Sequence, residues 1–304
     1  MNSYKNITVS VLMSTYNHSE FIEVAINSVL MQKCYFNVEL IIADDFSSDN
    51  TQEIVNKIIN KHHNGNWIKY TRHTTNKGAY SNALWILSQA NSKYVAICEG
   101  DDYWTDPNKL QKQVDFLENN NDFVLCYHKT SILANGIIED DYFIKKNISQ
   151  ISSYYDLLCY GNYMQTSSVV FLNNLKSFPF EKKIQLNDYV LWFWISKFGK
   201  IYRINEDMSV YRMGLGIWSS LNDNQKNFHI LKSLYEVKKI VKNENDLIVL
   251  DNRITSLIYS FLPIEFQKIN INQFNSKEFL SRHVNIKLLI SSIIYKIIKK
   301  YFTK

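Results

Sequence analysis

Between residues 7 and 100, four short apolar runs alternate with longer amphipathic segments. The runs cover residues 7–13, 38–44, 67–73 and 94–100, and their length and β-branched content predict buried strands. The segments between them predict helices, and Ser19 is placed to cap the first one. Strands that alternate with helices predict an α/β protein with a parallel, doubly wound sheet.

Polar residues follow each of the four predicted strands. Ligands bind to such sheets outside the carboxyl ends of the strands, so these segments are candidate site residues. Asp, Asn and Ser are also ordinary turn residues, and each segment taken alone is equally well explained by a turn. All four reach the same edge of the sheet, and together they predict a site. The segments are Ser14–Asn17, Asp44–Ser47, Arg72–Gly78 and Glu99–Asp102.

Carboxylates dominate this predicted edge. The cluster at residues 99–102 suits a hard divalent cation, Mg²⁺ or Mn²⁺, which takes its other ligands from substrate phosphates and water. Asp44 and Asp45 can accept hydrogen bonds from a ribose or a base, and Arg72 can face a phosphate or pack near the base. No GxGxxG or GxxxxGK[ST] segment is present, so the predicted nucleotide-diphosphate site lacks a Gly-rich loop.

Four segments resemble, in order and spacing, the successive motifs of family 2 glycosyltransferases with the GT-A fold. They are VSVLMSTYNHSEFIEVAINSVLMQ, ELIIADDFSSDNT, HTTNKGAYSNA and AICEGDDYWTDPNKLQKQVDFLE. The resemblance implies a Rossmann-like, mostly parallel sheet flanked by helices, with a C-terminal helical extension. It implies a catalytic domain at 1–215, made of a nucleotide-sugar-binding half (1–105) and an acceptor half (106–215), and a helical extension at 216–304.

The resemblance also assigns the donor site. It implies that Thr15, Tyr16 and Asp45 contact a uridine-like nucleoside, that Asp101 lies near the ribose, and that Asp102 binds Mn²⁺ or Mg²⁺. The donor-binding candidates are Thr15, Tyr16, Asn17, Asp44, Asp45, Arg72, Asn76, Gly78, Asn82, Glu99, Asp101, Arg212 and Trp218.

The family also uses an acidic residue at the start of a helix to deprotonate the acceptor hydroxyl. In QLNDYVLWFW the candidate is Asp188, since a helix N-terminus favours a carboxylate and the aromatic residues limit water. The alternative is that Asp188 merely caps its helix beside Asn187. The polar trio at 166–168 resembles the entry to the acceptor-side strand, and a plain polar strand start explains it nearly as well.

The segment YRMGLGIWSS departs from the family pattern. Relatives commonly carry a His after the YR, near the donor diphosphate, and here Met213 and Gly214 replace it. No imidazole is available at this place, which leaves the third metal ligand open. Arg212 and Trp218 remain to order the loop over the donor.

Composition limits the expected partners and the cellular compartment of the protein. The net charge of +5 is mild, and no stripe of Arg interleaved with aromatics is present, so no nucleic-acid partner is expected. The four cysteines form no CxxC pair, and the N-terminus reads as a strand and not as a signal peptide. Free thiols and no signal peptide predict a cytoplasmic protein.

The tail at 286–304 has the pattern of a basic amphipathic helix. It is too short and too charged to span a bilayer. Such a helix either lies on an anionic membrane surface, packs on its own domain, or forms the seam of a homodimer, and the pattern does not choose among these. If it binds lipid, the protein sits at the inner face of the cell membrane.

Together these features predict an inverting, metal-dependent glycosyltransferase. Its donor is a nucleotide-diphosphate sugar, UDP-linked, and its acceptor is a glycan or a lipid-linked glycan of cell-surface polysaccharide synthesis. One alternative is a catalytically inactive nucleotide-sugar-binding protein. The missing His is the observation that keeps this alternative open. A signalling receiver domain is a further alternative, but it needs acidic residues where STYN and RHTTN stand.

Overall fold

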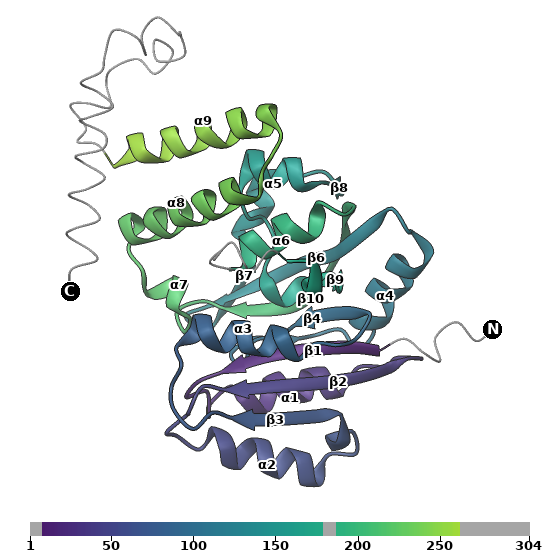
Figure 1. The fold of residues 1–304 in the computed structure, drawn as a ribbon. Helices are drawn as coiled ribbons and strands as arrows, with labels where there is room; N and C mark the ends of the chain where they lie inside the picture. Colours follow the sequence, from purple (N-terminus) through teal and green to yellow (C-terminus); the bar gives the residue numbers. More distant parts are fainter. Residues whose placement is uncertain (1–7, 179–186, 262–304) are drawn as a thin grey trace, which may run out of the picture. The chain divides into compact units, whose positions relative to one another are not determined.

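A computed structural model describes residues 8–178 and 187–261 (Figure 1). Its strands form one sheet in the order β3-β2-β1-β4-β9-β6-β10-β5, with β7 paired to β6 and β8 to β10. The strands are β1 (Thr8–Thr15), β2 (Asn37–Asp44), β3 (Ile68–Arg72), β4 (Tyr94–Ile97), β5 (Tyr103–Trp104), β6 (Phe123–Ala134), β7 (Ile137–Asp140), β8 (Ile151–Ser152), β9 (Val170–Leu172) and β10 (Lys200–Arg212).

Helices cover both faces of this sheet. The α-helices are α1 (Ile22–Leu30), α2 (Thr51–Lys61), α3 (Ala79–Gln89), α4 (Lys109–Asn119), α5 (Tyr154–Tyr160), α6 (Asp188–Ser196), α7 (Ile217–Ser220), α8 (Asp223–Ile240) and α9 (Glu244–Ser260). The 3₁₀ helices are η2 (Gly65–Trp67), η3 (Tyr142–Lys146), η4 (Thr166–Ser168) and η5 (Leu175–Ser177).

The first half of the sheet is parallel, as predicted. Strand β1 pairs in parallel with β2 and β4, and β2 pairs in parallel with β3. The register sets Thr15 opposite Asp44, and Asp44 opposite Arg72. The polar residues that follow the strands therefore do meet at one edge.

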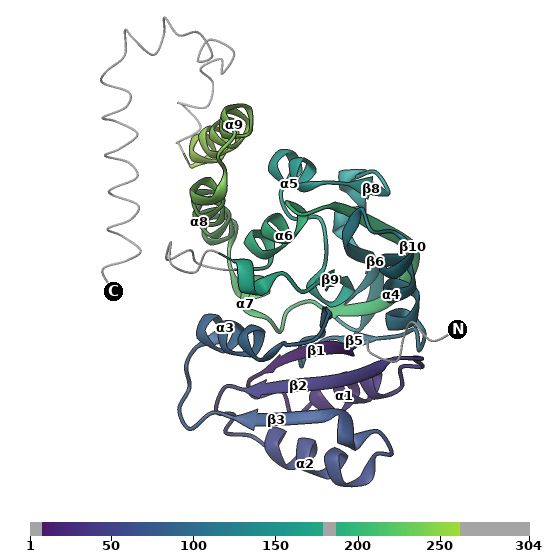
Figure 2. The same cartoon turned by 45° about the vertical axis from the view of Figure 1, so that its right-hand side comes forward.

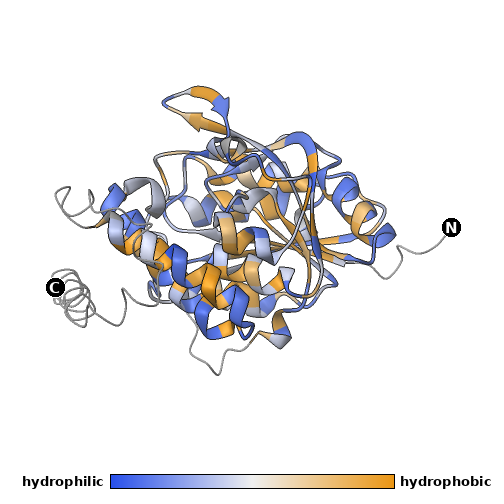
Figure 3. Ribbon diagram, turned by 90° about the horizontal axis from the view of Figure 1, so that it is seen from above, coloured by the Kyte–Doolittle hydropathy of each residue, from blue (hydrophilic) through white to orange (hydrophobic). Residues whose placement is uncertain are grey.

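The core lies mainly on one face of these strands. Helices α1, α2 and α4 contribute to a single apolar cluster with β1, β2 and β4, whereas α3 contacts β1 and β2 on the opposite face (Figure 2). The strands run as largely hydrophobic ribbons between helices that carry hydrophobic and hydrophilic stripes (Figure 3). Cys98 and Cys126 are buried in this core, and all four cysteine thiols are free.

The second half of the sheet is mixed. Strand β9 pairs antiparallel with β4 and β6, while β10 runs parallel to β6 and antiparallel to β5 and β8. Sequence predicts a strand and a turn at residues 199–213, but β10 is one long strand with register shifts against β6. The shifts bend β10, and its end at Arg212 reaches the loop after β4.

One local prediction is wrong. Ser19 does not cap α1, which has Phe21 at its N-cap and no side-chain cap, because the Ser19 amide donates to Asp49 Oδ2 (2.9 Å) and the loop turns at His18. Residues 166–168 form η4, in which Ser168 Oγ donates to the Gln165 carbonyl (2.7 Å), and β9 begins directly afterwards at Val170, so the polar trio does precede a strand.

The described residues up to Ile254 form one compact unit, which includes α8 and most of α9, and the end of α9 from Thr255 is assigned to a second unit. Within the first unit α8 packs on α6. The division at residue 215 stays a prediction. The amphipathic tail at 286–304 lies outside the described residues. No helix in the described part of the chain is long and apolar enough to cross a membrane.

Candidate active site

The loop after β1 begins the site. Thr15 is buried, and its Oγ1 has no hydrogen-bond partner among the described residues. Tyr16 is exposed at the surface. Asn17 has a positive φ of 53° and ties this loop to the loop after β2, since its amide donates to Ser47 Oγ (2.9 Å) and its Oδ1 accepts from the Ser48 amide (2.8 Å).

The two aspartates after β2 differ in their contacts. Asp44 accepts from the Ser47 amide (2.7 Å) and from the Tyr70 hydroxyl (2.6 Å). Both of its carboxylate oxygens therefore form hydrogen bonds within the protein. Asp45 is buried, and its Oδ1 accepts from the Lys77 amide (2.7 Å). Asp45 therefore fixes the loop that leads into α3.

Arg72 and Phe46 form a stacked pair at the same edge. The Arg72 guanidinium lies 4.4 Å from the centre of the Phe46 ring, and its Nη2 donates to the Ser47 carbonyl (2.7 Å). Phe46 has a φ of 68°, rare for a bulky residue, and is 41% exposed. This exposed ring offers a surface on which a base can stack. Sequence reasoning missed Phe46, although an aromatic residue directly after an acidic pair was a usable signal.

The segment before α3 contains the other predicted donor residues. Asn76 Oδ1 accepts from the Gly78 amide (2.9 Å), and Gly78 has a φ of 82° that favours glycine. Asn82 is buried: its Oδ1 lies 3.0 Å from His73 Nε2, and its Nδ2 donates to the Ala43 carbonyl (3.0 Å). Asn82 thus ties α3 to the ends of β2 and β3, while Asn76 and Gly78 stay exposed.

The acidic cluster follows β4. Burial raises the pKa of Asp102 well above its usual range, and the charges of Asp101 and Glu99 raise it further. Burial also raises the pKa of Glu99, with added contributions from Asp101 and Asp188. Asp102 is 1% exposed, and its Oδ1 accepts from the Arg212 amide (3.0 Å). Carboxylates under this repulsion are stabilised by a proton or by a cation.

Gly100 allows the cluster to approach the first loop. A Cβ at this position would lie 2.9 Å from both Thr15 Oγ1 and His18 Nδ1. Both atoms are buried and without a hydrogen-bond partner in the described residues. Sequence gave His18 no role in the site, and the structure places its ring here. Its position could not be read from spacing, because it results from packing against Gly100.

The segment after β10 closes this side of the site. The Arg212 guanidinium lies over Tyr103 (4.5 Å) and Phe21 (5.3 Å), and its Nη1 donates to the Asp101 carbonyl (2.5 Å). Arg212 therefore orders the acidic loop from its backbone side. A Cβ on Gly216 would come within 4.0 Å of Asp101 Oδ2, so the loop before α7 passes beside the cluster, and Trp218 in α7 is 41% exposed.

Asp188 is the first residue of α6, and it is not the cap. Asn187 is the N-cap, with its Oδ1 accepting from the Val190 amide (3.0 Å). Asp188 Oδ1 accepts from the Tyr189 amide (2.7 Å), and its Oδ2 accepts from Asn162 Nδ2 (2.9 Å). The residue keeps contact with solvent, yet the protein atoms packed around its carboxylate raise its pKa. Asn187 is therefore the N-cap, whereas Asp188 accepts an amide within the first turn, and its role as the base stays a prediction.

Asp188 lies near enough to the acidic cluster for its charge to affect Glu99. The charge of Asp188 contributes to the raised pKa of Glu99. Burial raises the pKa of Tyr142, and the charges of Asp141, Asp188 and Asp102 add to this. The Tyr142 hydroxyl therefore experiences both the predicted base and the predicted metal ligand. Sequence reasoning missed Tyr142, because its segment carries no motif.

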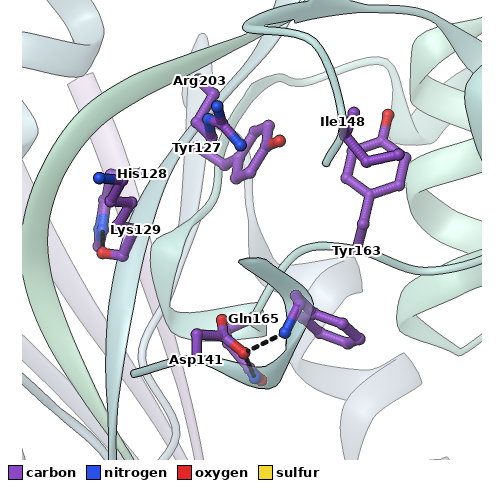
Figure 4. Close-up of a pocket in the computed structure, with 9 residues that line it drawn as sticks. Tyr127, His128, Lys129, Asp141, Ile148, Tyr163, Gln165 and Arg203 are labelled. Atoms are coloured by element: carbon purple, nitrogen blue, oxygen red, sulfur yellow. Dashed lines mark hydrogen bonds between the residues drawn. The ribbon is translucent and has the colours of Figure 1, made fainter. Parts of the chain in front are cut away.

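A small cavity lies beside β6 and β10 (Figure 4). Its volume of about 20 Å³ holds about one water molecule, and none of the predicted site residues lines it. His128 Nε2 and Arg203 Nε line it and are buried without a hydrogen-bond partner in the described residues. Figure 4 shows Gln165 donating to Asp141 at its wall. The cavity suits an ordered water and is too small for a sugar.

The donor set at the acidic cluster suits Mg²⁺ or Mn²⁺. Within the described residues, no three His, Cys, Asp or Glu side chains are grouped as a complete metal site. These ions usually take one or two protein carboxylates and complete their shell with phosphates and water. Asp102 can supply one such carboxylate, since it is buried and repelled by the charges of Asp101 and Glu99, which a cation would offset.

Residues 10–171 match the sequence model of the family described as "Glycosyl transferase family 2". Two *Escherichia coli* relatives are UDP-Glc:alpha-D-GlcNAc-diphosphoundecaprenol beta-1,3-glucosyltransferases. WfaP is 30% identical over 74% of this chain and 86% of its own length, and WfgD is 33% identical over 75% and 84%. The *Mycobacterium tuberculosis* protein Rv1520, named as uncharacterized, is 32% identical over 72% of this chain, and the match spans 63% of its length.

Solved structures share the fold. TarS from *S. aureus* (residues 1–349), in complex with UDP-GlcNAc, superposes with a TM-score of 0.62 at 18% identity, over 88% of this chain and 77% of that chain. The mannosyltransferase PcManGT from *Pyrobaculum calidifontis*, in complex with GDP-Man and Mn²⁺, gives 0.59 at 12% identity, over 99% and 89%. The predicted GT-A fold is confirmed.

Proposed function

Because this chain belongs to glycosyltransferase family 2, we propose that it transfers a sugar from a nucleotide-diphosphate donor to a glycan or lipid-linked acceptor. The observation that carries the proposal is the buried Asp102 carboxylate after β4, whose Oδ1 accepts from the Arg212 amide at the end of β10. The names of WfaP and WfgD support a UDP-linked donor and an undecaprenyl-diphosphate acceptor. A role in cell-surface polysaccharide synthesis, at the inner face of the membrane, belongs to the same proposal.

The donor side binds the nucleotide. Phe46 offers a ring for the base, with Arg72 stacked on its other face, and Asp45 and Thr15 lie at the same strand edge. Asp102 would hold Mn²⁺ or Mg²⁺, and when bound this ion offsets the charge that develops on the leaving diphosphate. Arg212 holds the backbone of the acidic loop in place.

The acceptor side performs the proton transfer. Asp188 accepts the proton of the acceptor hydroxyl, whose oxygen forms the new bond to the anomeric carbon. The bond from that carbon to the diphosphate oxygen breaks, and the nucleoside diphosphate leaves with its electron pair. One base and a single in-line displacement give inverted configuration, so an α-linked donor yields a β-linked product. The raised pKa of Asp188 brings it nearer to neutral pH, which suits a general base.

Asp188→Asn tests the base. Asn keeps the shape and can still accept from the Tyr189 amide, but it cannot take the proton. Turnover should fall by roughly 10²-fold or more, the usual scale for a lost general base, while donor affinity changes little. Turnover is followed as release of the nucleoside diphosphate, and the configuration of the wild-type product by its anomeric proton coupling. Near-normal turnover in Asp188→Asn, or a retained configuration, would refute the assignment.

A catalytically inactive sugar-nucleotide binder is the second candidate, because the exposed Met213 stands where relatives carry a His. Thermal stabilisation by a panel of sugar nucleotides with Mn²⁺ identifies the donor for either candidate. Only an enzyme then forms product with a matching acceptor. Stabilisation without product across a broad acceptor panel would favour the inactive binder.

A further inference from the structure

Asn162 makes a contact with Asp188 that the predicted motifs do not contain. We propose that Asn162 is a positioning residue for Asp188, which holds the carboxylate in the orientation that accepts the proton. This inference rests on the proposed function, because it takes Asp188 to be the base. Asn162 lies in the loop between α5 and η4, 26 residues before Asp188.

Both ends of the Asn162 amide are engaged. Its Nδ2 donates to Asp188 Oδ2 (2.9 Å), and its Oδ1 accepts from the Met164 amide (3.1 Å). A flipped amide would set its oxygen against the carboxylate and its NH₂ against the Met164 N–H. The hydrogen bonds therefore fix which end of the amide faces Asp188.

Asp188 is held from two directions as a result. The Tyr189 amide donates to Oδ1, and Asn162 donates to Oδ2, so rotation of the carboxylate would break at least one of these bonds. Each carboxylate oxygen can still accept a further hydrogen bond. The two donors thus orient the group and leave it able to receive a proton.

The loop that carries Asn162 is itself fixed by two cations. Lys146 Nζ donates to the carbonyls of Tyr160 (2.8 Å) and Asn162 (2.5 Å). Arg253 Nη1 donates to the Leu158 carbonyl (2.5 Å) at the end of α5, where the helix dipole favours a cation. The loop is therefore anchored before it presents its side chain to Asp188.

A purely structural role for Asn162 is the competing explanation. The bond from the Met164 amide closes a short turn that many loops contain, and it needs only an acceptor oxygen. The donor bond to Asp188 is not needed for that turn. Asn162→Asp keeps the acceptor for the turn and replaces the donor by a negative charge, so it separates the two roles.

Full-length wild type, Asn162→Ala, Asn162→Asp, Asp188→Asn and the Asn162→Ala/Asp188→Asn double variant are compared by steady-state kinetics. The donor is the sugar nucleotide found by the stabilisation panel. Both Asn162 variants should lower kcat by roughly tenfold or more, with donor KM unchanged within about twofold. The double variant should match Asp188→Asn alone, because the effect of Asn162 passes through Asp188. Asn119→Ala, which removes a similar side-chain bond at the exposed C-terminal end of α4, is the control.

The pH profile gives a further readout. Loss of a hydrogen bond to the charged form raises the pKa of a carboxylate, so the acid limb of kcat should move to higher pH in Asn162→Ala and further in Asn162→Asp. Glu99 and Tyr142 also interact electrostatically with Asp188 and are unchanged in both variants.

Three outcomes would overturn the inference. They are wild-type kcat in Asn162→Asp, losses that multiply in the double variant, or unchanged kcat in Asn162→Ala while Asp188→Asn is inactive. If Asp188→Asn keeps near-normal turnover, the assignment of Asp188 as the base in the proposed function fails instead, and the two failures are thereby distinguished.

Discussion

The two halves of the sheet hold their polar side chains by different means. Around β1–β4, the aspartates are tied to nearby loops of the same half, as Asp44 is to Ser47 and Asp45 to Lys77. In the half built on β6, β9 and β10, Asp188 is held by Asn162 from another loop. That loop is anchored by Lys146 and by Arg253 of α9.

The difference predicts how far from a substituted residue the site should be affected. In the first half, the bonds that hold Asp44 and Asp45 join loops of that same half, so a substitution there should affect the site through neighbouring loops. Asp102 is the exception, because it accepts from the Arg212 amide of the other half.

In the second half, Asp188, the proposed base, is oriented by Asn162, whose loop follows the end of α5 that Arg253 of α9 contacts. Variants in α9 should therefore alter chemistry without touching a substrate.

Asp102→Asn should have the largest effect. Asn can still accept from the Arg212 amide, so the variant removes the charge and leaves this hydrogen bond between the halves in place. Turnover should fall by roughly 10²-fold or more if a cation is bound there. The measurement is turnover with added Mn²⁺, compared with wild type in EDTA. Full activity in either case would remove the cation from the mechanism.

Gly100→Ala should have the next largest effect, confined to the first half. Its Cβ would lie 2.9 Å from Thr15 Oγ1 and His18 Nδ1, so the β1 loop must shift. Donor affinity should fall by roughly tenfold, measured by titration calorimetry with the nucleoside diphosphate. Gly216→Ala is the matched control, because its Cβ meets nothing closer than 4.0 Å. The Tm and donor affinity of both variants are compared with those of the wild type. Equal behaviour of the two variants would contradict the steric argument.

Arg253→Met should lower kcat by roughly threefold to tenfold, a smaller loss than at Asp188. It removes the donor to the carbonyls of Leu157 and Leu158 and to the Tyr189 hydroxyl, which loosens the support of the Asn162 loop. Donor affinity should stay unchanged. The control is Lys238→Met, which breaks an exposed α8–α9 ion pair with Asp251. If donor affinity fell as much as kcat, the claim that Arg253 supports only the Asp188 side of the site would be contradicted.

Lys109→Met should change stability and not chemistry. Burial lowers the pKa of Lys109 from 10.5 to about 7, although its Nζ donates to Gln113 and lies 4.1 Å from the Trp104 ring centre. Between these pH values the unfolded chain holds a proton that the native protein lacks, so this lysine makes stability rise with pH from about 7 to 10. Tm measured over that range should rise less steeply in the variant. Parallel curves would show that Lys109 stays charged.

Local patterns predicted the first half well, because each strand of that half is a contiguous apolar run and its site residues follow directly in sequence. They failed where distant groups compete. Ser19 has the sequence of a cap, but Asp49 accepts from its amide. The bond from Asn162 to Asp188 spans 26 residues, and the bond from Arg253 to Leu157 spans 96. No periodicity encodes such contacts.

The resemblance made Asp188 the candidate base, and the structure shows which groups donate hydrogen bonds to it. The sequence alone could not choose between a base and a cap, because the choice depends on whether Asn187 or Asp188 accepts from Val190. Phe46 and Tyr142 were also missed. The exposure of Phe46 follows from its left-handed backbone, and the position of Tyr142 follows from the path of η3.

Only residues 98–102 join β4 to β5, and β5 pairs with the C-terminal part of β10, so the end of β10 returns to the loop after β4. Asp101 and Asp102 lie in this short loop. The end of β10 therefore cannot move away from β4 without displacing the acidic residues. If Asp102 holds a cation as proposed, a denaturant titration should show the cation lost no later than the first partial separation of these strands.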